Sequence, residues 1–349
     1  MRRQGIHQLL GPVALVLIVG IASGFVSAAN DIYFLNALLA VAMVVSIYVF
    51  VGNSGVLSFG HISFVAVGAF SAGVMTIPLE SKSAVMPGLF PLLRDHTIGN
   101  VPSLLLGAIL GGLLAFLIGL PLMRLSGLAA SIATFAVLQI AYNVLSNWTS
   151  IGPGQTALSL VPETTHGVQA VIGVLVVIAI AFAYQQSRFG RLLRASREDA
   201  AAAEGVGINV HRQRLWAFTL SGALAGFSGA LYVHMLGSLL ASSVYLDLTF
   251  LTLAMLVVGG ATSLWGATLG ALLVSGLDSF LSQAEAGVNV GFTLDIPQGS
   301  TLVVLGAAMA LVLIVRPSGI TGGREFTVPR LPRRRADDAT PSTMEGSTS

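Results

Sequence analysis

Charged side chains gather in one polar stretch of this sequence, SRFGRLLRASREDAAAAEGVGINVHRQRLWAF (Ser187–Phe218). The stretch places six arginines and three acids around a run of alanines, in a chain where only 9% of residues are charged. Guanidinium groups could anchor such a stretch to anionic lipid, or flank a surface that docks onto a partner. Neither use is catalytic, so the chemistry indicated here is binding.

Motifs that would support catalysis are absent. The chain has no cysteine, which excludes disulfides, thiolate nucleophiles and thiolate metal sites. Lys82 is the only lysine, so the lysine of a nucleotide-binding P-loop is missing, and neither HExxH nor GxSxG occurs. A net charge of +2 gives no indication of nucleic acid. We expect no catalytic, metal or cofactor site in this chain, which leaves transport, sensing or scaffolding.

The composition predicts a membrane protein that is all α-helical. Of the 349 residues, 54% are hydrophobic, and apolar runs recur at about the 20 residues that cross a bilayer as a helix. The runs do not alternate with a period of two, which excludes a porin-like barrel. We predict a polytopic bundle of about ten transmembrane helices, with eight to ten compatible. The predicted spans are 9–28, 34–51, 55–77, 101–122, 126–146, 168–186, 213–236, 248–261, 265–282 and 300–315, with the eighth and ninth separated at Gly259–Ser263.

The distribution of positive charge predicts the orientation. Only Lys82 and Arg94 of the 17 Lys and Arg residues fall in loops on the outer side, leaving 15 on the inner side. An excess of this size predicts that both termini are cytoplasmic. We therefore expect a cytoplasmic N-terminus (1–8), a transmembrane domain (9–323) with a cytoplasmic loop (187–212), and a disordered tail (324–349). A cleavable signal ending near SAAN (27–30) is the alternative for the first span, although the apolar run is long for one.

Glycines four residues apart recur in the predicted spans. The pairs are Gly107 with Gly111, Gly222 with Gly226, and Gly266 with Gly270. Small residues at this spacing let helices approach closely, so we expect them to pack helix against helix.

The polar stretch should contain a short helix. Ser196 followed by Asp199 resembles a capping box, which predicts a helix that begins at Arg197. Alanines 200–203 favour the helix, and Gly205 can end it in the left-handed conformation. Two interpretations remain open: arginines that anchor to lipid, or a helix with few side chains that docks into a groove on a soluble partner.

Four sequence blocks, in order, carry a family resemblance. They are GNSGVLSFGHISFVAVGAF (52–70), SRFGRLLRASREDAAAAEGVGIN with AFTLSGALAGFSGALY (187–232), VVGGATSLWGATLGA (257–271) and RPSGITG (316–322). Together they closely resemble the permease subunits of branched-chain amino acid ABC importers, the LivM-like family. Asp199-Ala200-Ala201 with Gly205 also looks like the EAA loop of such permeases, although Asp replaces Glu at 199 and the Leu-Pro end of the general motif is missing.

The resemblance implies the remainder of a transport machine in a bacterial inner membrane. It implies a second, related permease subunit, two cytoplasmic ATPase subunits that bind ATP and Mg²⁺, and an external substrate-binding protein. The loop helix would then couple the ATPase to the membrane domain. The coupling residues it implies are Arg194, Arg197, Glu198, Asp199, Ala200, Ala201, Ala202 and Gly205. Importers of urea and short amides use very similar permeases, so the substrate stays open.

Polar residues inside spans are costly in lipid and are candidates for a substrate pathway. Gln139 and Asn143 lie four residues apart on one face of the fifth span, and His61 lies early in the third span, inside the block 52–70. Each could instead serve packing or bonding between helices. Asp278 is the only carboxylate inside a predicted span, which disfavours a self-sufficient secondary transporter driven by ions.

Overall fold

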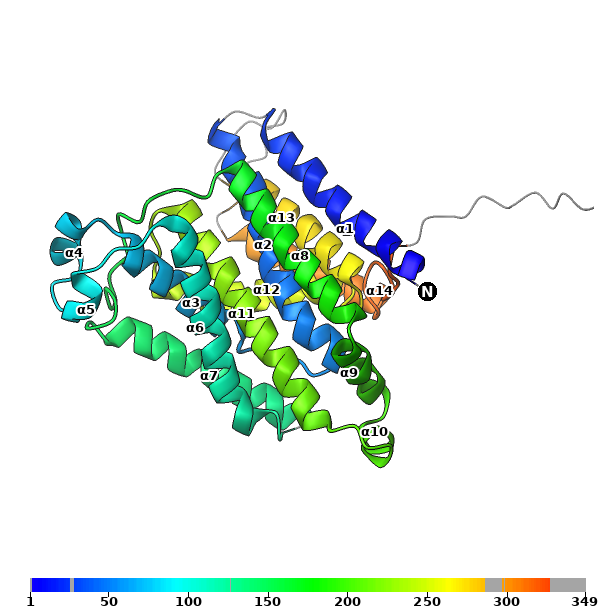
Figure 1. Ribbon diagram of the computed structural model, residues 1–349. Helices are drawn as coiled ribbons and strands as arrows, with labels where there is room; N and C mark the ends of the chain where they lie inside the picture. Colours follow the sequence, from blue (N-terminus) through cyan, green and yellow to red (C-terminus); the bar gives the residue numbers. More distant parts are fainter. Residues whose placement is uncertain (1, 26–27, 126, 286–296, 298, 327–349) are drawn as a thin grey trace, which may run out of the picture.

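The computed structural model describes residues 2–25, 28–125, 127–285, 297 and 299–326. Over these ranges the chain forms fourteen α-helices and one 3-10 helix, with no strand. Ten of the helices make up the bundle, and short helices occupy the connections (Figure 1). The ten are α1 (Arg2–Ser23), α2 (Ala28–Ser54), α3 (His61–Thr76), α6 (Asn100–Leu122), α7 (Gly127–Asn147), α8 (Gly167–Gln186), α11 (Val210–Leu236), α12 (Leu246–Gly259), α13 (Leu264–Glu285) and α14 (Ser300–Val315).

Every predicted span falls on one of these ten helices, which confirms a polytopic helical membrane bundle. Within the described ranges, seven segments are long and apolar enough to cross a membrane, while the apolar parts of α1, α3 and α14 are shorter. The break predicted at Gly259–Ser263 separates α12 from α13. The predicted start of the third span at residue 55 was wrong, because α3 begins at His61 and Gly55 has a φ of 71°, which stops the helix.

Helix α2 forms the centre of the bundle (Figure 1). The most apolar stretch of α2 is 83% buried inside this single chain, against 33% for α7 and for α8. Its principal neighbours are α11, α13 and α8. Helix α7 instead lies at the edge, with its main contacts on α3, η1 (Ala241–Val244) and α6.

Close helix crossings are made by the glycines predicted for packing. A Cβ atom on Gly111 of α6 would lie only 2.6 Å from the carbonyl oxygen of Gly222 on α11. A Cβ atom on Gly270 of α13 would lie 2.6 Å from the Cα atom of Gly259 on α12. Larger side chains there would push the backbones apart, so the α6–α11 and α12–α13 pairs depend on these glycines.

The turn between α12 and α13 is closed by the chain's C-terminal described segment. Ile320 and Thr321 donate backbone N–H groups to the last carbonyls of α12, at 2.8 and 3.2 Å. The Glu325 carboxylate accepts from the first N–H groups of α13, on Leu264 and Trp265, at 3.0 and 3.3 Å. The predicted disordered tail therefore starts too early, because Glu325 caps a helix. Residues 327–349 of that tail lie outside the described residues.

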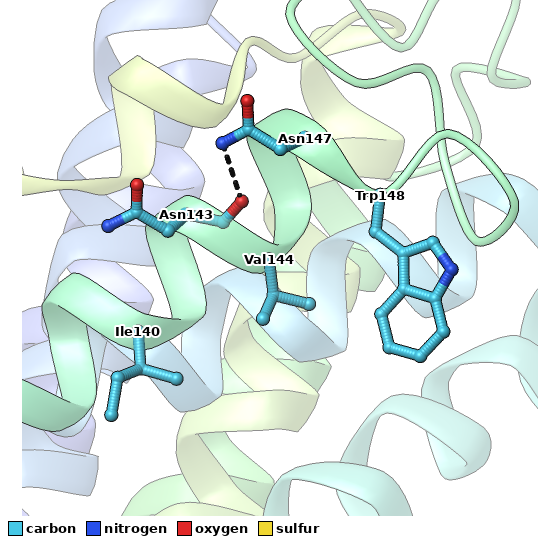
Figure 2. Close-up of a pocket in the computed structure, with 5 residues that line it drawn as sticks. All are labelled: Ile140, Asn143, Val144, Asn147 and Trp148. Atoms are coloured by element: carbon cyan, nitrogen blue, oxygen red, sulfur yellow. Dashed lines mark hydrogen bonds between the residues drawn. The ribbon is translucent and has the colours of Figure 1, made fainter.

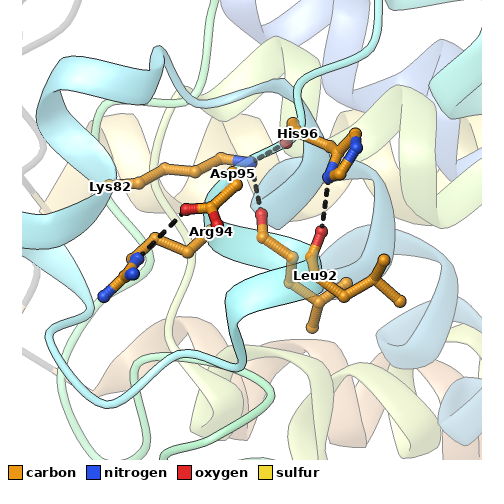
Figure 3. Close-up of polar contacts among 6 residues, drawn as sticks. Lys82, Leu92, Arg94, Asp95 and His96 are labelled. Carbon is orange, nitrogen blue, oxygen red and sulfur yellow. Dashed lines mark hydrogen bonds and ion pairs between the residues drawn. The ribbon is translucent and has the colours of Figure 1, made fainter.

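A small polar cap covers the end of the bundle that lies farthest from α9 (Arg188–Glu198) and α10 (Ala200–Gly205) (Figure 1). It is built from α4 (Leu79–Val85) and α5 (Pro91–Arg94). Lys82 is fully buried, and its ammonium group donates to the carbonyl oxygens of Leu93 at 2.9 Å and His96 at 2.5 Å (Figure 3). Burial lowers the pKa of Lys82. The only lysine of the chain thus holds the two halves of this cap together.

Replacing Lys82 with methionine should loosen the cap. Lys82→Met keeps the side-chain length but leaves the Leu93 and His96 carbonyls without this donor, which should cost about 1 to 3 kcal/mol locally. Hydrogen exchange of the backbone amides in residues 93–98 should become faster. Arg94→Gln is the matched control, because the Arg94–Asp95 ion pair is exposed and should contribute little. Unchanged exchange in Lys82→Met would contradict this role.

Candidate functional site

The polar stretch folds as two consecutive helices, α9 and α10, at one end of the bundle (Figure 1). Helix α9 begins at a cap, where the Ser187 hydroxyl accepts from the Gly190 N–H at 3.2 Å. Leu193 and Ser196 are buried against the bundle, while Arg188 and Arg191 are exposed. Helix α9 is therefore fixed to the bundle along one face.

Arg194 joins α9 to the end of α8. One guanidinium nitrogen donates to the carbonyl oxygen of Gln185 at 2.7 Å. A cation near the C-terminal carbonyls of a helix is stabilised both by the hydrogen bond and by the helix dipole. Arg194 thus points back into the protein and away from any soluble partner.

Arg197 makes a second connection, to the end of α2. Its Nη1 donates to the Gly52 carbonyl oxygen at 3.0 Å, while Nη2 lies 2.8 Å from the carboxylate of Glu198. The side chain of Arg197 is 26% exposed and that of Glu198 is 75% exposed. Glu198 therefore neutralises Arg197 from the solvent side and leaves the arginine directed at α2.

Helix α10 is short but capped at both ends. The Asp199 carboxylate accepts from the Ala202 N–H at 2.9 Å. At the other end Gly207 has a φ of 85°, and Ile208 and Gly207 donate N–H groups to the carbonyls of Ala203 and Glu204. This is the Schellman pattern of helix termination. Capping lets six residues, Ala200–Gly205, hold a helical shape outside the bundle.

The predicted start of this helix was wrong, whereas α10 does end at Gly205 as predicted. Ser196 does not cap it, because its hydroxyl bonds to the Leu193 carbonyl inside α9. Asp199 is the cap instead, so the helix begins at Ala200 rather than Arg197. The left-handed residue is Gly207 rather than Gly205. Asp199 replaces Ser196 because the chain bends there, with an extended backbone at φ −150°.

The exposed residues of α10 have small side chains, except Glu204. Ala200, Ala201 and Ala202 are exposed, whereas Ala203 is buried. Val206, directly after the helix, is 77% exposed. The exposed face is thus smooth and weakly apolar, which suits close contact with a groove of another protein.

His61 is enclosed at the start of α3. Its ring lies among the rings of Phe50, Phe64 and Phe218, with centroid distances of 5.6, 5.9 and 5.2 Å. The residue is 1% exposed, and neither ring nitrogen has a hydrogen-bond partner among the described residues. In this arrangement His61 packs in the core and does not line an open path.

Gln139 is bonded to a neighbouring element. The Tyr245 hydroxyl donates to the Gln139 side-chain oxygen, and the Tyr245 ring stacks on Tyr142 with centroids 4.1 Å apart. Tyr245 lies between η1 and α12, so this contact fixes α7 to that junction. The sequence left two roles open for Gln139, a substrate pathway or bonding between helices. In this arrangement Gln139 bonds to a neighbouring element.

Asn143 is exposed on α7, together with Asn147 one turn later. The Asn143 amide donates to the Gln139 carbonyl at 2.8 Å, and the Asn147 amide donates to the Asn143 carbonyl at 2.9 Å. Both line a shallow, open hollow on this helix, with Ile140, Val144 and Trp148 (Figure 2). Two exposed amides on an apolar helix are costly in lipid, so this face is better suited to protein or water.

Three residues with a part in these arrangements are not among the sequence-based candidates. Asn147 could have been found, because it follows Gln139 and Asn143 at the same spacing of four. Tyr245 and Glu325 could not, because their partners are far away in the sequence.

A sequence model of the family described as "Branched-chain amino acid transport system / permease component" matches residues 31–313, which is most of the chain. The chain belongs to this permease family. The match covers the bundle from α2 to α14 and includes α9, α10 and the polar face of α7. It assigns the permease to transport and not to enzymatic catalysis.

Curated relatives agree with the family and differ in substrate. The permease is 26% identical to the high-affinity branched-chain amino acid permease LivM of Escherichia coli over 78% of its own length and 65% of the relative's. It is 23% identical to the "Probable branched-chain amino acid transport permease protein LivM" of Methanocaldococcus jannaschii, covering 81% and 90%. It is also 26% identical to the autoinducer 2 import permease LsrC of Shigella flexneri, covering 52% and 56%. No solved structure matches the permease.

Removing the α10 cap should destabilise this helix selectively. Asp199→Ala loses the acceptor for the Ala202 N–H, which should cost about 1 kcal/mol of helix stability. Amide hydrogen exchange in residues 200–206 should become faster. Asp199→Asn is the matched control, since asparagine caps about as well, and it should behave like the original protein. If Asp199→Ala and Asp199→Asn both exchange faster than the original protein and at the same rate, the negative charge of Asp199 rather than its capping hydrogen bond stabilises α10.

Proposed function

We propose that this permease is the membrane subunit of an ATP-driven importer that accepts branched-chain or related amino acids from an external binding protein. It works with a second permease subunit and two cytoplasmic ATPase subunits, which supply ATP and Mg²⁺ binding. The membrane is the bacterial inner membrane, and both termini and α9–α10 face the cytoplasm. The supporting observation for coupling is α10, a doubly capped helix with a smooth alanine face.

The proposed role of α10 is to seat in a groove of an ATPase subunit. Ala200, Ala201 and Ala202 offer an exposed face that lets backbone and partner approach closely. Arg194 and Arg197 support the same loop from the side of the bundle, because they hydrogen-bond it to α8 and α2. A helix capped at both ends can transmit a displacement made by the ATPase subunit, because it has few internal degrees of freedom in which the displacement would be lost.

The substrate pathway is proposed to run along the polar face of α7. Asn143 and Asn147 are exposed there, and their amides would face a second permease subunit or the water-filled path between the two subunits. His61 would contribute only in an arrangement that opens its aromatic enclosure. Two discrete arrangements, inward-open and outward-open, are what an ATP-driven cycle requires.

Substrate choice is proposed to reside mainly in the binding protein. A free amino acid carries an ammonium and a carboxylate, whereas the spans of this chain carry almost no charge. The family name and the LivM relatives favour branched-chain amino acids, and the LsrC relative shows that similar permeases serve other substrates. The substrate is tested in the reconstituted complex, by adding binding protein loaded with leucine, another amino acid or urea. The measurement is the stimulation of ATP hydrolysis. Stimulation by urea and not by leucine would refute the amino acid assignment.

A bulky charged residue on α10 should uncouple the importer. Ala202→Arg should leave membrane insertion intact, because the position is exposed outside the bundle, but should prevent α10 from seating. Uptake by the reconstituted complex should fall at least about tenfold, corresponding to a lost interaction of about 1.4 kcal/mol or more. Ala195→Arg, an equal change at an exposed position of α9, and Gln139→Ala on α7 are the controls for ATPase binding. Normal uptake by Ala202→Arg would refute the seating of α10.

A further inference from the structure

Segment 52–60, which comprises the last residues of α2 and the link to α3, contacts both α9 and α7. On one side Arg197 of α9 donates to the Gly52 carbonyl at 3.0 Å. On the same side Gly55 leaves room for the arginine, because a Cβ atom on Gly55 would lie 2.6 Å from the Arg197 Cγ atom. Gly55 also has a φ of 71°, so the chain turns out of α2 directly beside Arg197.

On its other side the same segment is bonded to the first turns of α7. The Phe59 N–H donates to the Thr134 hydroxyl at 3.2 Å, and the Ser131 hydroxyl donates to the Leu57 carbonyl at 3.1 Å. Gly60 packs directly on this helix, since a Cβ atom there would lie 2.7 Å from the Thr134 carbonyl oxygen. These contacts lie on the helix that carries Asn143 and Asn147.

We propose that Arg197 is a positioning residue that transmits movement of α9–α10 through segment 52–60 to α7. This inference rests on the proposed function, in which an ATPase moves α10. In series the contacts are Arg197 to Gly52, the 52–60 backbone, and Phe59 to Thr134. Movement of α10 thereby reaches the polar face of α7 without passing through the glycine-packed crossing of α6 and α11.

The packing of the elements favours transmission along this route. Helix α7 lies at the edge of the bundle and packs mainly on α3, η1 and α6, so a displacement near Thr134 disturbs less packing than a displacement of central α2 would. Segment 52–60 is not helical after Ser54, so a shift of this part breaks no helical backbone hydrogen bond. Its buried Asn53 and Ser58 side chains keep oxygen atoms without hydrogen-bond partners among the described residues, which leaves them available to bond in a second arrangement.

Arg197→Gln tests the input contact in the full complex reconstituted with its ATPase subunits and binding protein. ATPase subunits should still bind, because α10 keeps its caps, but substrate transported per ATP should fall about tenfold, within the range of coupling between sites. Arg191→Gln removes an exposed arginine from the same helix and should keep the original ratio. Absence of ATP-dependent uptake in the original complex would refute the proposed function, whereas normal coupling in Arg197→Gln would refute the relay alone.

Thr134→Val tests the output contact and keeps the side-chain volume. If the contacts act in series, the double variant Arg197→Gln/Thr134→Val should couple no worse than the more impaired single variant. Losses that multiply would show independent effects and overturn the relay.

A spectroscopic distance separates transmission from a merely structural role. Because the chain has no cysteine, spin labels can be placed at Ala136→Cys on α7 and Leu105→Cys on α6, both exposed positions. Addition of ATP should change the distance between the labels in the original complex. Arg197→Gln should bind the ATPase and hydrolyse ATP without that change, and a normal change in this variant would overturn the proposal.

Discussion

Backbone polar groups have no water to bond with inside a membrane, so the places where a membrane helix stops need other hydrogen-bond partners. At three such places in the described part of the chain, the partner comes from a segment distant in the sequence. Arg197 donates to the Gly52 carbonyl near the end of α2, and Thr134 accepts from the N–H of Phe59 before α3. Residues 320–325 close the turn between α12 and α13 from both sides. The bonds that satisfy these breaks are therefore also the bonds that connect one helix to another.

The bundle divides into a tightly packed part and a loosely packed edge. Glycines bring α6 and α11 into backbone contact, and central α2 is almost fully enclosed. Helix α7 packs on α3, η1 and α6, and hydrogen bonds join it to segment 52–60 and to Tyr245. Packed cores resist gradual deformation, so movement between two arrangements is easier at the edge than in the centre. The polar residues proposed for the pathway lie on the movable edge.

Charged residues are sparse in this chain, and four of them bond to its own backbone. Arg194 and Arg197 bond to helix ends, Lys82 binds loop carbonyls, and Glu325 caps α13. Each of these charges satisfies the permease's own backbone and none is directed at the hollow on α7. These four charges are therefore committed to the structure of the permease itself.

Sequence alone determined the helical membrane class, the position of every bundle helix, the break before Ser263 and the packing role of the glycines. These features follow from apolar runs, charge asymmetry and local propensity, which act over a few residues. It also located the short helix in the polar loop, but misplaced its cap, because Ser196 and Asp199 both favour a helix start and only the docking of α9 on the bundle decides between them. Tertiary structure alone decided that Arg197 bonds to α2, that Tyr245 binds Gln139 and that Glu325 caps α13. Each of these contacts joins residues more than 60 positions apart and forms only when the helices pack. Local sequence patterns act over a few residues and therefore do not predict such contacts.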